Sequence, residues 1–324
     1  MWIGRSVKYG WRVLWVFVVI LAPHWVLAQP ATRPATAPAT GPATTQAVVP
    51  FREAVETRRE EPYPGLAIEY RRYEQPRPLR VWVAKIDLGR EGVKLTATCG
   101  SDIGPEFETR CETTPEFAER TGVDLAINAS AFHPLREKTG EPMQVVGIGA
   151  CGGAVYSPPD ERFGAFLVDK DGTVHIGEPP FDLGKVREAL SGFHMLVDDG
   201  RDVVERTAGL QKPAFVGVNP RTAIGIDRAG RTLFLAAFDG RQKGVSEGIT
   251  LYELSRFFLD LGAFDALNMD GGGSTTMVLR NPATGKYDIL NTPVGRGEPN
   301  TLRLVANNLG VILPSPQRPA SNPS

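Results

Sequence analysis

The 324-residue chain is predicted to fold as a single α+β or mixed α/β domain, with a strand-rich mixed sheet and a few packed helices. Three observations favour this class. Alternating apolar stretches indicate strands, two segments have the order helix, glycine, buried strand, and Asp-Gly or Ala-Gly pairs mark tight turns. A hydrophobic content of 42% is sufficient for one large core.

The strands are predicted from alternation and from turn residues. Asp171-Gly172 and Ala229-Gly230 each lie between two apolar stretches, which is typical of hairpins. The predicted single strands are residues 79–88, 93–98 and 301–313, and the predicted hairpins are residues 166–176 and 221–238.

The clearest helix is predicted after Thr250. Thr250 and Glu253 have the spacing of a capping box, and apolar residues then recur at helical spacing. Gly262 is suited to a left-handed stop, and an apolar stretch follows up to Asn268. This order predicts a buried strand whose end faces a crevice.

A second helix–strand unit is predicted from Thr114-Pro115, where proline suits the first turn of a helix, to Gly122. The residues after Gly122 and Gly262 have the same order: three residues, alanine, an aliphatic residue and asparagine. Either this match arose by chance, or Asn128 and Asn268 lie at neighbouring strand ends and share one crevice.

The segments outside this domain differ in composition. Residues 1–28 combine a basic start, an apolar stretch and a small-residue cleavage motif, which predicts a signal peptide rather than an uncleaved anchor. Residues 29–55 are a Pro/Ala/Thr-rich linker, residues 60–313 the folded domain, and residues 314–324 a disordered tail. We therefore expect an exported protein that is periplasmic, secreted or attached to the cell envelope.

Charge and cysteine content limit the partners. A formal net charge of -1 without a long basic run argues against nucleic acid, and no stable membrane insertion is expected after signal cleavage. Three cysteines permit one disulfide, for which Cys99 and Cys111 are the nearest pair, leaving Cys151 free. No cysteine or histidine spacing indicates zinc. Oligomeric state is not predicted.

The most informative segment runs from Asn268 to Thr276. A buried strand ends in Asn268 and Asp270, and three glycines and three hydroxyl residues follow. Glycine permits backbone shapes in which successive N–H groups face one anion. A carboxylate beside such a loop suits a site for phosphate or developing negative charge, whereas a plain turn rarely needs three glycines.

Several motifs in order resemble the phosphodiester glycosidase family. They are residues 219–227 (NPRTAIGID), 239–241 (DGR) and 268–274 (NMDGGGS), with weaker likeness at 128–132 (NASAF) and 191–197 (SGFHMLV). The last two depart from the family pattern by loss of glycines and of a proline. The resemblance covers roughly residues 80–313. It implies a hydrolase that splits a sugar from a sugar-1-phosphodiester.

The residue chemistry assigns roles within this resemblance. A phosphodiester is an anion that arginines bind well, and the departing monoester needs little protonation because its second pKa is about 6. One carboxylate could therefore suffice. The predicted catalytic residues are Asp270, Asp239 as second choice, and Asn268. The predicted phosphate and sugar contacts are Arg221, Arg241, Arg303, Asn128, Gly271, Gly272, Gly273, Ser274 and Thr275.

Alternatives stay open at this point. The same residues could form a non-catalytic module that binds anionic polysaccharide, or a phosphodiesterase that cuts the P–O bond. No cofactor is required by the sequence, although Asp270 or Asp239 could hold Ca²⁺ or Mg²⁺. The expected substrate is a phosphate-containing carbohydrate, such as a cell-wall or exopolysaccharide glycopolymer or an N-acetylglucosamine-1-phosphodiester.

Overall fold

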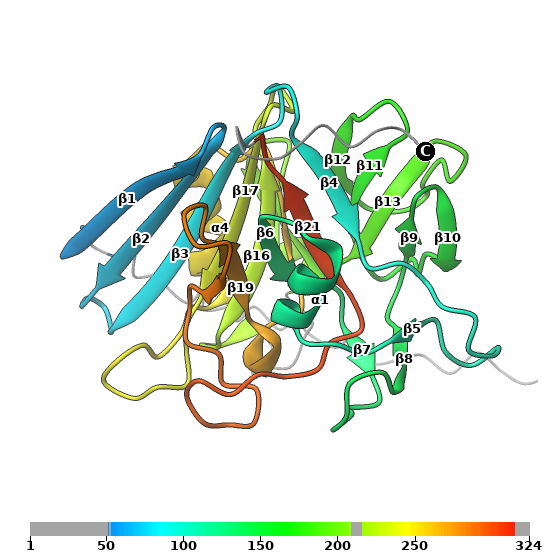
Figure 1. The fold of residues 1–324 in the computed structure, drawn as a ribbon. Helices are drawn as coiled ribbons and strands as arrows, with labels where there is room; N and C mark the ends of the chain where they lie inside the picture. Colours follow the sequence, from blue (N-terminus) through cyan, green and yellow to red (C-terminus); the bar gives the residue numbers. More distant parts are fainter. Residues whose placement is uncertain (1–50, 52, 209–215, 315–324) are drawn as a thin grey trace, which may run out of the picture. The chain divides into compact units, whose positions relative to one another are not determined.

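A computed structural model describes residues 51, 53–208 and 216–314. The predicted signal peptide, most of the linker and nearly all of the tail lie outside these residues, so those assignments stay predictions. Four sheets and few helices form the described part (Figure 1). The helices are α1 (Thr114–Thr121), α2 (Val204–Ala208), α4 (Leu251–Leu261) and the 3₁₀ turn η1 (Gly272–Ser274).

The largest sheet has eight strands. In order across the sheet they are β1 (Glu56–Tyr63), β2 (Leu66–Tyr73), β3 (Leu79–Asp87), β17 (Thr232–Phe238), β16 (Arg221–Ile226), β18 (Asp265–Asn268), β14 (His194–Asp198) and β15 (Arg201–Asp202). Its central strands are buried on both faces. On β3, Val81 and Val83 pack toward the core beneath α4, and Ala84 and Ile86 pack into the core on the other side.

Three smaller sheets complete the fold. One consists of β10 (Ala154–Ser157), β9 (Gly149–Cys151), β13 (Val186–Ser191), β11 (Ala165–Asp169) and β12 (Val174–Gly177). The next consists of β20 (Tyr287–Ile289), β19 (Met277–Arg280), β6 (Leu125–Asn128), β21 (Asn308–Ile312) and β4 (Lys94–Ala97). The smallest consists of β5 (Thr109–Arg110), β8 (Pro142–Val145) and β7 (Phe132–His133).

One large core holds the sheets together. Ile224 and Leu267 of the eight-stranded sheet, Ile127 of the β6 sheet, and Phe166 and Leu190 of the β11 sheet belong to the same buried cluster. Helix α1 covers the outer side of the β6 sheet through a separate small cluster. Among the described residues, no helix is long and apolar enough to cross a membrane.

Local signals predicted both longer helices correctly. Thr250 caps α4 and forms a capping box with Glu253, and Gly262 ends the helix in the left-handed conformation at φ 90°. Helix α1 likewise ends at Gly122, but its N-cap is Thr113, so Pro115 lies one position deeper than predicted.

The predicted hairpins are present, as β11–β12 and β16–β17. The predicted fold class needs a correction, since strands make up 42% and helices 11%. Every pairing between the named strands is antiparallel, so the sheets are not mixed. Both predicted helix–strand units are present, as α1–β6 and α4–β18, and β6 and β18 each pair with antiparallel strands. The last predicted strand is also shorter, because only residues 308–312 form β21.

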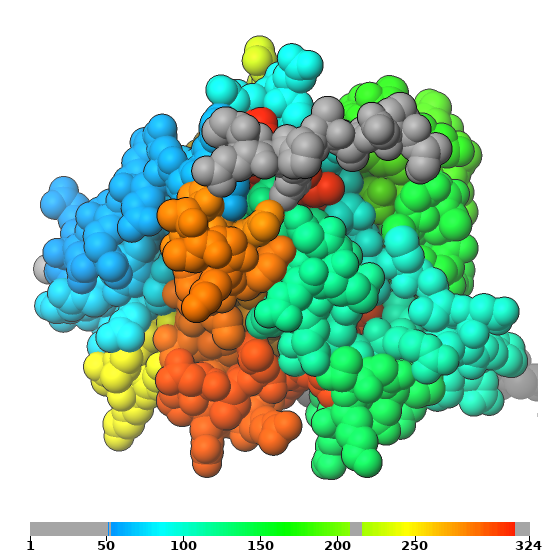
Figure 2. Space-filling model, viewed as in Figure 1, coloured from blue at the N-terminus to red at the C-terminus, as the bar shows by residue number. Residues whose placement is uncertain are grey.

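Two long connections lie on either side of a notch at the lower edge of Figure 2. One is the orange to red segment 291–303, and the other is the green segment between β7 and β8. Within the first, Val294 and Thr301 form a bridge, and the Gly295 N–H donates to the Thr301 carbonyl at 2.7 Å. This connection is therefore held by its own hydrogen bonds.

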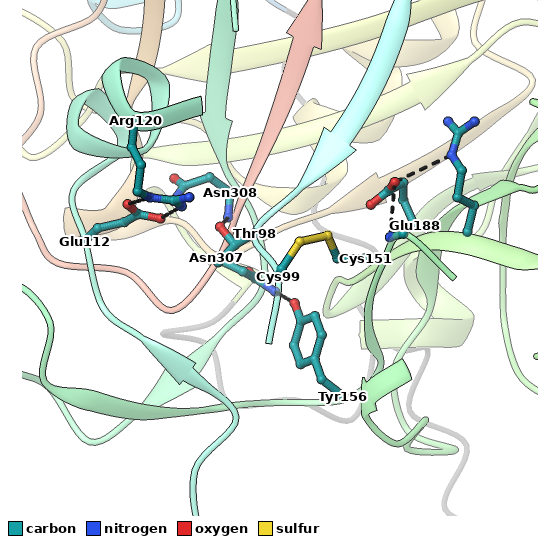
Figure 3. The surroundings of a disulfide bond; sticks show 11 residues. Thr98, Cys99, Glu112, Arg120, Cys151, Tyr156, Glu188, Asn307 and Asn308 are labelled. Atoms are coloured by element: carbon teal, nitrogen blue, oxygen red, sulfur yellow. Dashed lines mark hydrogen bonds and ion pairs between the residues drawn. A yellow bond between two sulfur atoms is a disulfide. The ribbon is translucent and has the colours of Figure 1, made fainter. Parts of the chain in front are cut away.

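The disulfide differs from the predicted pair (Figure 3). Cys99, beyond the end of β4, is bonded to Cys151 of β9, with a Cα–Cα distance of 4.9 Å. The free cysteine is Cys111, whose buried thiol donates to the Lys138 carbonyl. Closeness along the chain misled the prediction, because the disulfide joins two sheets whose contact is non-local.

Candidate active site

Four neighbouring strands of the large sheet bring polar residues to the same edge, the one formed by the strand ends rather than by an outermost strand. Asn268 ends β18 and pairs with His194, which begins β14. Arg221 begins β16 and pairs with Phe238, which ends β17. Because neighbouring strands run in opposite directions, the start of one lies beside the end of the next. The chain leaving β17 and β18 at this edge then carries Arg241 and Asp270.

A cavity of about 410 Å³ opens at this edge. Its volume is within the range of small-ligand sites. Three arginines face one carboxylate, so the lining has an excess of positive charge. The lining residues are Phe193, His194, Asn219, Pro220, Arg221, Arg241, Asn268, Met269, Asp270, Gly271, Gly272, Gly273 and Arg303.

Asp270 is the only carboxylate among the described residues that line this cavity. It is partly exposed, so water can reach it. Burial raises the pKa of Asp270 to about 6. A hydrogen bond with Ser274 and the charge of Arg303 oppose this rise. The carboxylate is therefore ionised at neutral pH but protonated under mildly acidic conditions.

Two of the three glycines permit close packing against other parts of the site. A Cβ on Gly271 would lie 2.7 Å from the Pro220 carbonyl oxygen. Gly272 has φ 61°, and a Cβ there would lie 3.0 Å from the Arg241 guanidinium. The Gly272 N–H donates to the Pro220 carbonyl at 2.9 Å. That amide is therefore engaged within the protein, and the predicted cradle of three glycine amides is not present in this form.

Gly273 makes room for the third arginine. A Cβ at this position would lie 2.4 Å from Arg303 Nη2 and 2.6 Å from its Cζ. Arg303 Nη2 also donates to the Gly295 carbonyl at 3.3 Å. The guanidinium thus lies against the glycine loop close enough to act on the Asp270 carboxyl group, whose pKa it lowers.

The other two arginines are held differently. Arg221 is 7% exposed, and its guanidinium donates to the backbone carbonyls of Gly217 at 2.8 Å and Ile249 at 3.4 Å. Burial and the charge of Arg241 lower the pKa of Arg221 to about 10, which leaves it cationic at neutral pH. Arg241 is exposed, has φ 59°, and donates to Asn219 Oδ1 at 3.1 Å.

His194 lines the cavity beside Asn268 but was not assigned a role from the sequence. Burial, with the charge of Arg221, lowers the pKa of His194 to about 4, so its imidazole is neutral at pH 7. Within the described part of the chain, His194 Nδ1 and Asn268 Oδ1 are buried without hydrogen-bond partners. Such atoms at a cavity wall favour a polar ligand. The family-like segment 191–197 contains His194, and the strand pairing places it beside Asn268.

Asn128 lies beneath the glycine loop and does not line the cavity. It is fully buried, and its Oδ1 accepts from Thr222 Oγ1 at 2.8 Å and the Thr276 N–H at 3.1 Å. Its Nδ2 donates to the Asp270 carbonyl at 2.7 Å. The ends of β6 and β18 do meet, because the Asp270 N–H donates to the Ala129 carbonyl at 2.9 Å, but the two strands belong to different sheets and Asn128 does not share the crevice with Asn268. Asn128 instead positions the loop that carries Asp270.

Asp239 is 1% exposed and also lies outside the cavity lining. Its Oδ1 accepts from the Thr292 N–H at 2.8 Å and from Asn291 Nδ2 at 3.3 Å. Asn291 in turn donates to the Thr275 carbonyl at 3.0 Å. Burial raises the pKa of Asp239 to about 6. Ser274 and Thr275 are buried as well and do not line the cavity.

Asp270 and Asp239, each considered from the sequence as a possible ligand for a divalent cation, lie in different surroundings. Asp270 lines the cavity, whereas Asp239 is engaged with segment 291–292. Across residues 51, 53–208 and 216–314, no group of three or more His, Cys, Asp or Glu side chains has an arrangement suited to a metal ion.

Comparison with known proteins agrees with the motifs. The sequence model of the phosphodiester glycosidase family matches residues 121–312. The chain is 32% identical over 190 residues to bovine N-acetylglucosamine-1-phosphodiester alpha-N-acetylglucosaminidase, covering 52% of this chain and 34% of that protein. It is 32% identical over 187 residues to the uncharacterized prophage protein YomE of Bacillus subtilis, covering 55% of this chain and 27% of YomE. The chain thus spans about a third of the length of these relatives.

A solved structure shares the fold. The catalytic domain of zebrafish N-acetylglucosamine-1-phosphodiester alpha-N-acetylglucosaminidase, auto-inhibited by its pro-peptide, aligns with a TM-score of 0.59 and 21% identity. The alignment covers 79% of this chain and 87% of that chain. A hypothetical protein from Synechocystis aligns with a TM-score of 0.58 and 16% identity, covering 81% of this chain and 64% of that one.

Proposed function

The chain belongs to the phosphodiester glycosidase family, and from that premise we propose that it hydrolyses the glycosidic C–O bond of a sugar-1-phosphodiester. One observation carries the proposal. Among the described residues, Asp270 is the single carboxylate lining a cavity that is also lined by Arg221, Arg241 and Arg303. The arginines would bind the anionic phosphodiester, and the carboxylate would act on the sugar carbon at which the bond is cleaved.

The leaving group explains why one carboxylate is enough. When the C1–O bond breaks, the electron pair stays on the phosphate oxygen, and arginines stabilise the resulting monoester. Most glycosidases use a second carboxyl group to protonate the departing oxygen. A phosphate monoester has a second pKa of about 6, so it departs without that proton. The water oxygen ends on C1, and its proton passes through Asp270 to solvent.

The remaining wall of the cavity recognises the sugar in this proposal. Asn268 Oδ1 and His194 Nδ1 lack partners within the described residues and accept hydrogen bonds from sugar hydroxyl or amide groups. In the neutral imidazole of His194 one ring nitrogen is an acceptor, and the tautomer with the proton on Nε2 makes Nδ1 that acceptor. Phe193 presents an aromatic ring on the same wall. N-Acetylglucosamine, which the name of the bovine relative specifies, is the sugar we propose first.

The cellular setting is a separate part of the proposal. The basic and apolar start of the chain and the Pro/Ala/Thr-rich residues 29–55 support export to the periplasm, envelope or medium. Cys99–Cys151 agrees with an oxidising compartment. We propose a cell-wall or exopolysaccharide glycopolymer with phosphodiester links as the natural substrate.

Hydrolysis in water labelled with heavy oxygen tests the bond that is cleaved. We expect no label in the released phosphate monoester and label in the sugar, read by mass spectrometry immediately after turnover. Label in the phosphate would mean attack at phosphorus and would refute the glycosidase assignment. Saturable binding without any product would instead indicate a binding module.

A further inference from the structure

A second cavity adjoins the active site and is basic. Its volume is about 470 Å³, and Arg303 lines both cavities. We propose that it is a second anion subsite, which binds the next phosphate along a substrate with repeating sugar-phosphate units. This inference rests on the proposed function and narrows its substrate class to polymers with several phosphodiesters. The lining residues are Leu135, Arg136, Glu137, Lys138, Gly295, Arg296, Leu302, Arg303 and Leu304.

The charge of this second cavity favours an anion. Four of its lining residues are cationic and only Glu137 is acidic. In the part of the chain that the structure describes, no acidic side chain forms an ion pair with Arg136, Lys138 or Arg296. Many other surface arginines do pair, such as Arg162 with Asp160 at 2.6 Å. The Glu141 carboxylate lies near Arg136 and Lys138 and accepts the Lys138 N–H at 2.9 Å, so these two cations are partly balanced, whereas the lining as a whole keeps an excess of positive charge.

Arg303 lies between the two cavities and lines both of them. Its guanidinium packs on Gly273 of the catalytic loop, and its Nε and Nη2 donate to the Gly295 carbonyl in the wall of the second cavity. A phosphate held at Asp270 and a second phosphate near Arg296 would thus lie on opposite sides of the same side chain. A linear polyanion can satisfy both sites, whereas a single phosphodiester can occupy only one.

The fold holds the Arg136 side chain and the backbone at Arg296 in place. Arg136 Nε donates to the Pro142 carbonyl at 2.8 Å, and its guanidinium stacks on Phe107 at 5.5 Å. The Arg296 N–H donates to Thr301 Oγ1 at 2.9 Å within the internally bonded connection 291–303. The two sides correspond to the segments that border the notch in Figure 2. A preformed site costs less ordering entropy on binding.

The same cavity also has apolar surface. Leu135 is 67% exposed, and Leu302 is partly exposed beside it. Sugar rings present C–H faces that pack on aliphatic side chains while their phosphates contact arginines. A glycan chain fits this combination better than inorganic phosphate, which has no apolar face.

The test compares two synthetic probes that differ in phosphate number. One is the methyl diester of N-acetylglucosamine-1-phosphate. The other contains two N-acetylglucosamine-1-phosphate units, joined by one phosphodiester and ending in a second, methylated phosphodiester. Binding is measured by calorimetry on full-length chain with Asp270→Asn, which limits cleavage. The test variant adds Lys138→Gln and Arg296→Gln, and the matched control adds Lys185→Gln and Lys286→Gln, which line neither cavity.

We expect the two-phosphate probe to bind about tenfold more tightly than the one-phosphate probe, with the preference reduced by added salt. The test variant should lose this preference and bind the one-phosphate probe unchanged within about twofold, while the control keeps it. Equal affinity for both probes in the parent, or equal weakening of both in the test variant, would overturn the proposal. Turnover of both probes by the unmutated chain is measured separately. Absence of turnover would refute the glycosidase assignment, whereas the binding comparison alone decides the second subsite.

Discussion

Substitution of Gly273 by alanine should impair the active site through Arg303. The new Cβ would lie 2.4 Å from Arg303 Nη2, whereas nonbonded carbon contacts are most favourable near 3.5–4.0 Å. The guanidinium must therefore move by about 1 Å. A misplacement of that size in a catalytic site costs about 10²-fold in rate. We expect kcat/KM for a sugar-1-phosphodiester to fall by about that factor.

The same displacement should change the pH profile. Arg303 lowers the pKa of Asp270, so a more distant Arg303 lets that pKa rise above about 6. The acid limb of kcat/KM should move to higher pH in the Gly273→Ala chain. Folding should be little affected, because Gly273 does not have the positive φ that would strain an alanine. Circular dichroism and the melting temperature check this point.

A control and a double-mutant cycle make the prediction refutable. Gly177→Ala is the matched control, because a Cβ there meets no atom within 4 Å. Once Arg303 is replaced by alanine, adding Gly273→Ala should have almost no further effect on kcat/KM. Unchanged activity in Gly273→Ala, or additive losses in the double variant, would refute the reasoning.

Three other predictions concern ionisation and stability. The kcat/KM of the unmutated chain should fall about tenfold per pH unit below pH 6, because Asp270 becomes protonated; a flat profile down to pH 4.5 would contradict this role. The raised pKa of Asp239 means that its ionisation destabilises the fold as pH rises from about 4 to above 6. Relative to Asp239→Asn, urea unfolding of the unmutated chain should therefore lose up to about 3 kcal/mol across that range, and a pH-independent difference would count against it. Thr250→Ala should lower the unfolding free energy by about 1 kcal/mol through loss of the α4 cap. Ser255→Ala in the same helix removes a buried hydroxyl bonded to the Leu196 carbonyl but leaves the cap intact, so it provides a comparison for the loss of the cap.

Local features were predictable from the sequence because they depend on neighbouring residues. The Thr250 cap, the Gly262 stop and the turn at Asp171-Gly172 each follow from side chains within a few positions. Non-local pairing was not predictable. Cys99 bonds to Cys151 across two sheets, and the antiparallel order of β14, β18 and β16 is set by packing of the whole core.

In the candidate site, too, some residues were predictable from the sequence and others were not. Asp270, Arg221, Arg241 and Arg303 were identified by residue type and motif, and all four line one cavity. Asp239 and Asn128 were expected in that cavity as well. Polarity at a strand end does not reveal whether a side chain meets solvent or a buried partner, and both side chains are used by buried hydrogen bonds.

The central claim is that Asp270 and its arginines hydrolyse sugar-1-phosphodiesters, and phosphorus NMR tests it most directly. A panel of sugar-1-phosphodiesters is incubated with the unmutated chain and with Asp270→Asn. We predict conversion of the diester resonance to a monoester resonance with release of free sugar, slowed by about 10²- to 10⁴-fold in the variant. Conversion by Asp270→Asn at the unmutated rate, or no monoester from any member of the panel, would contradict the account.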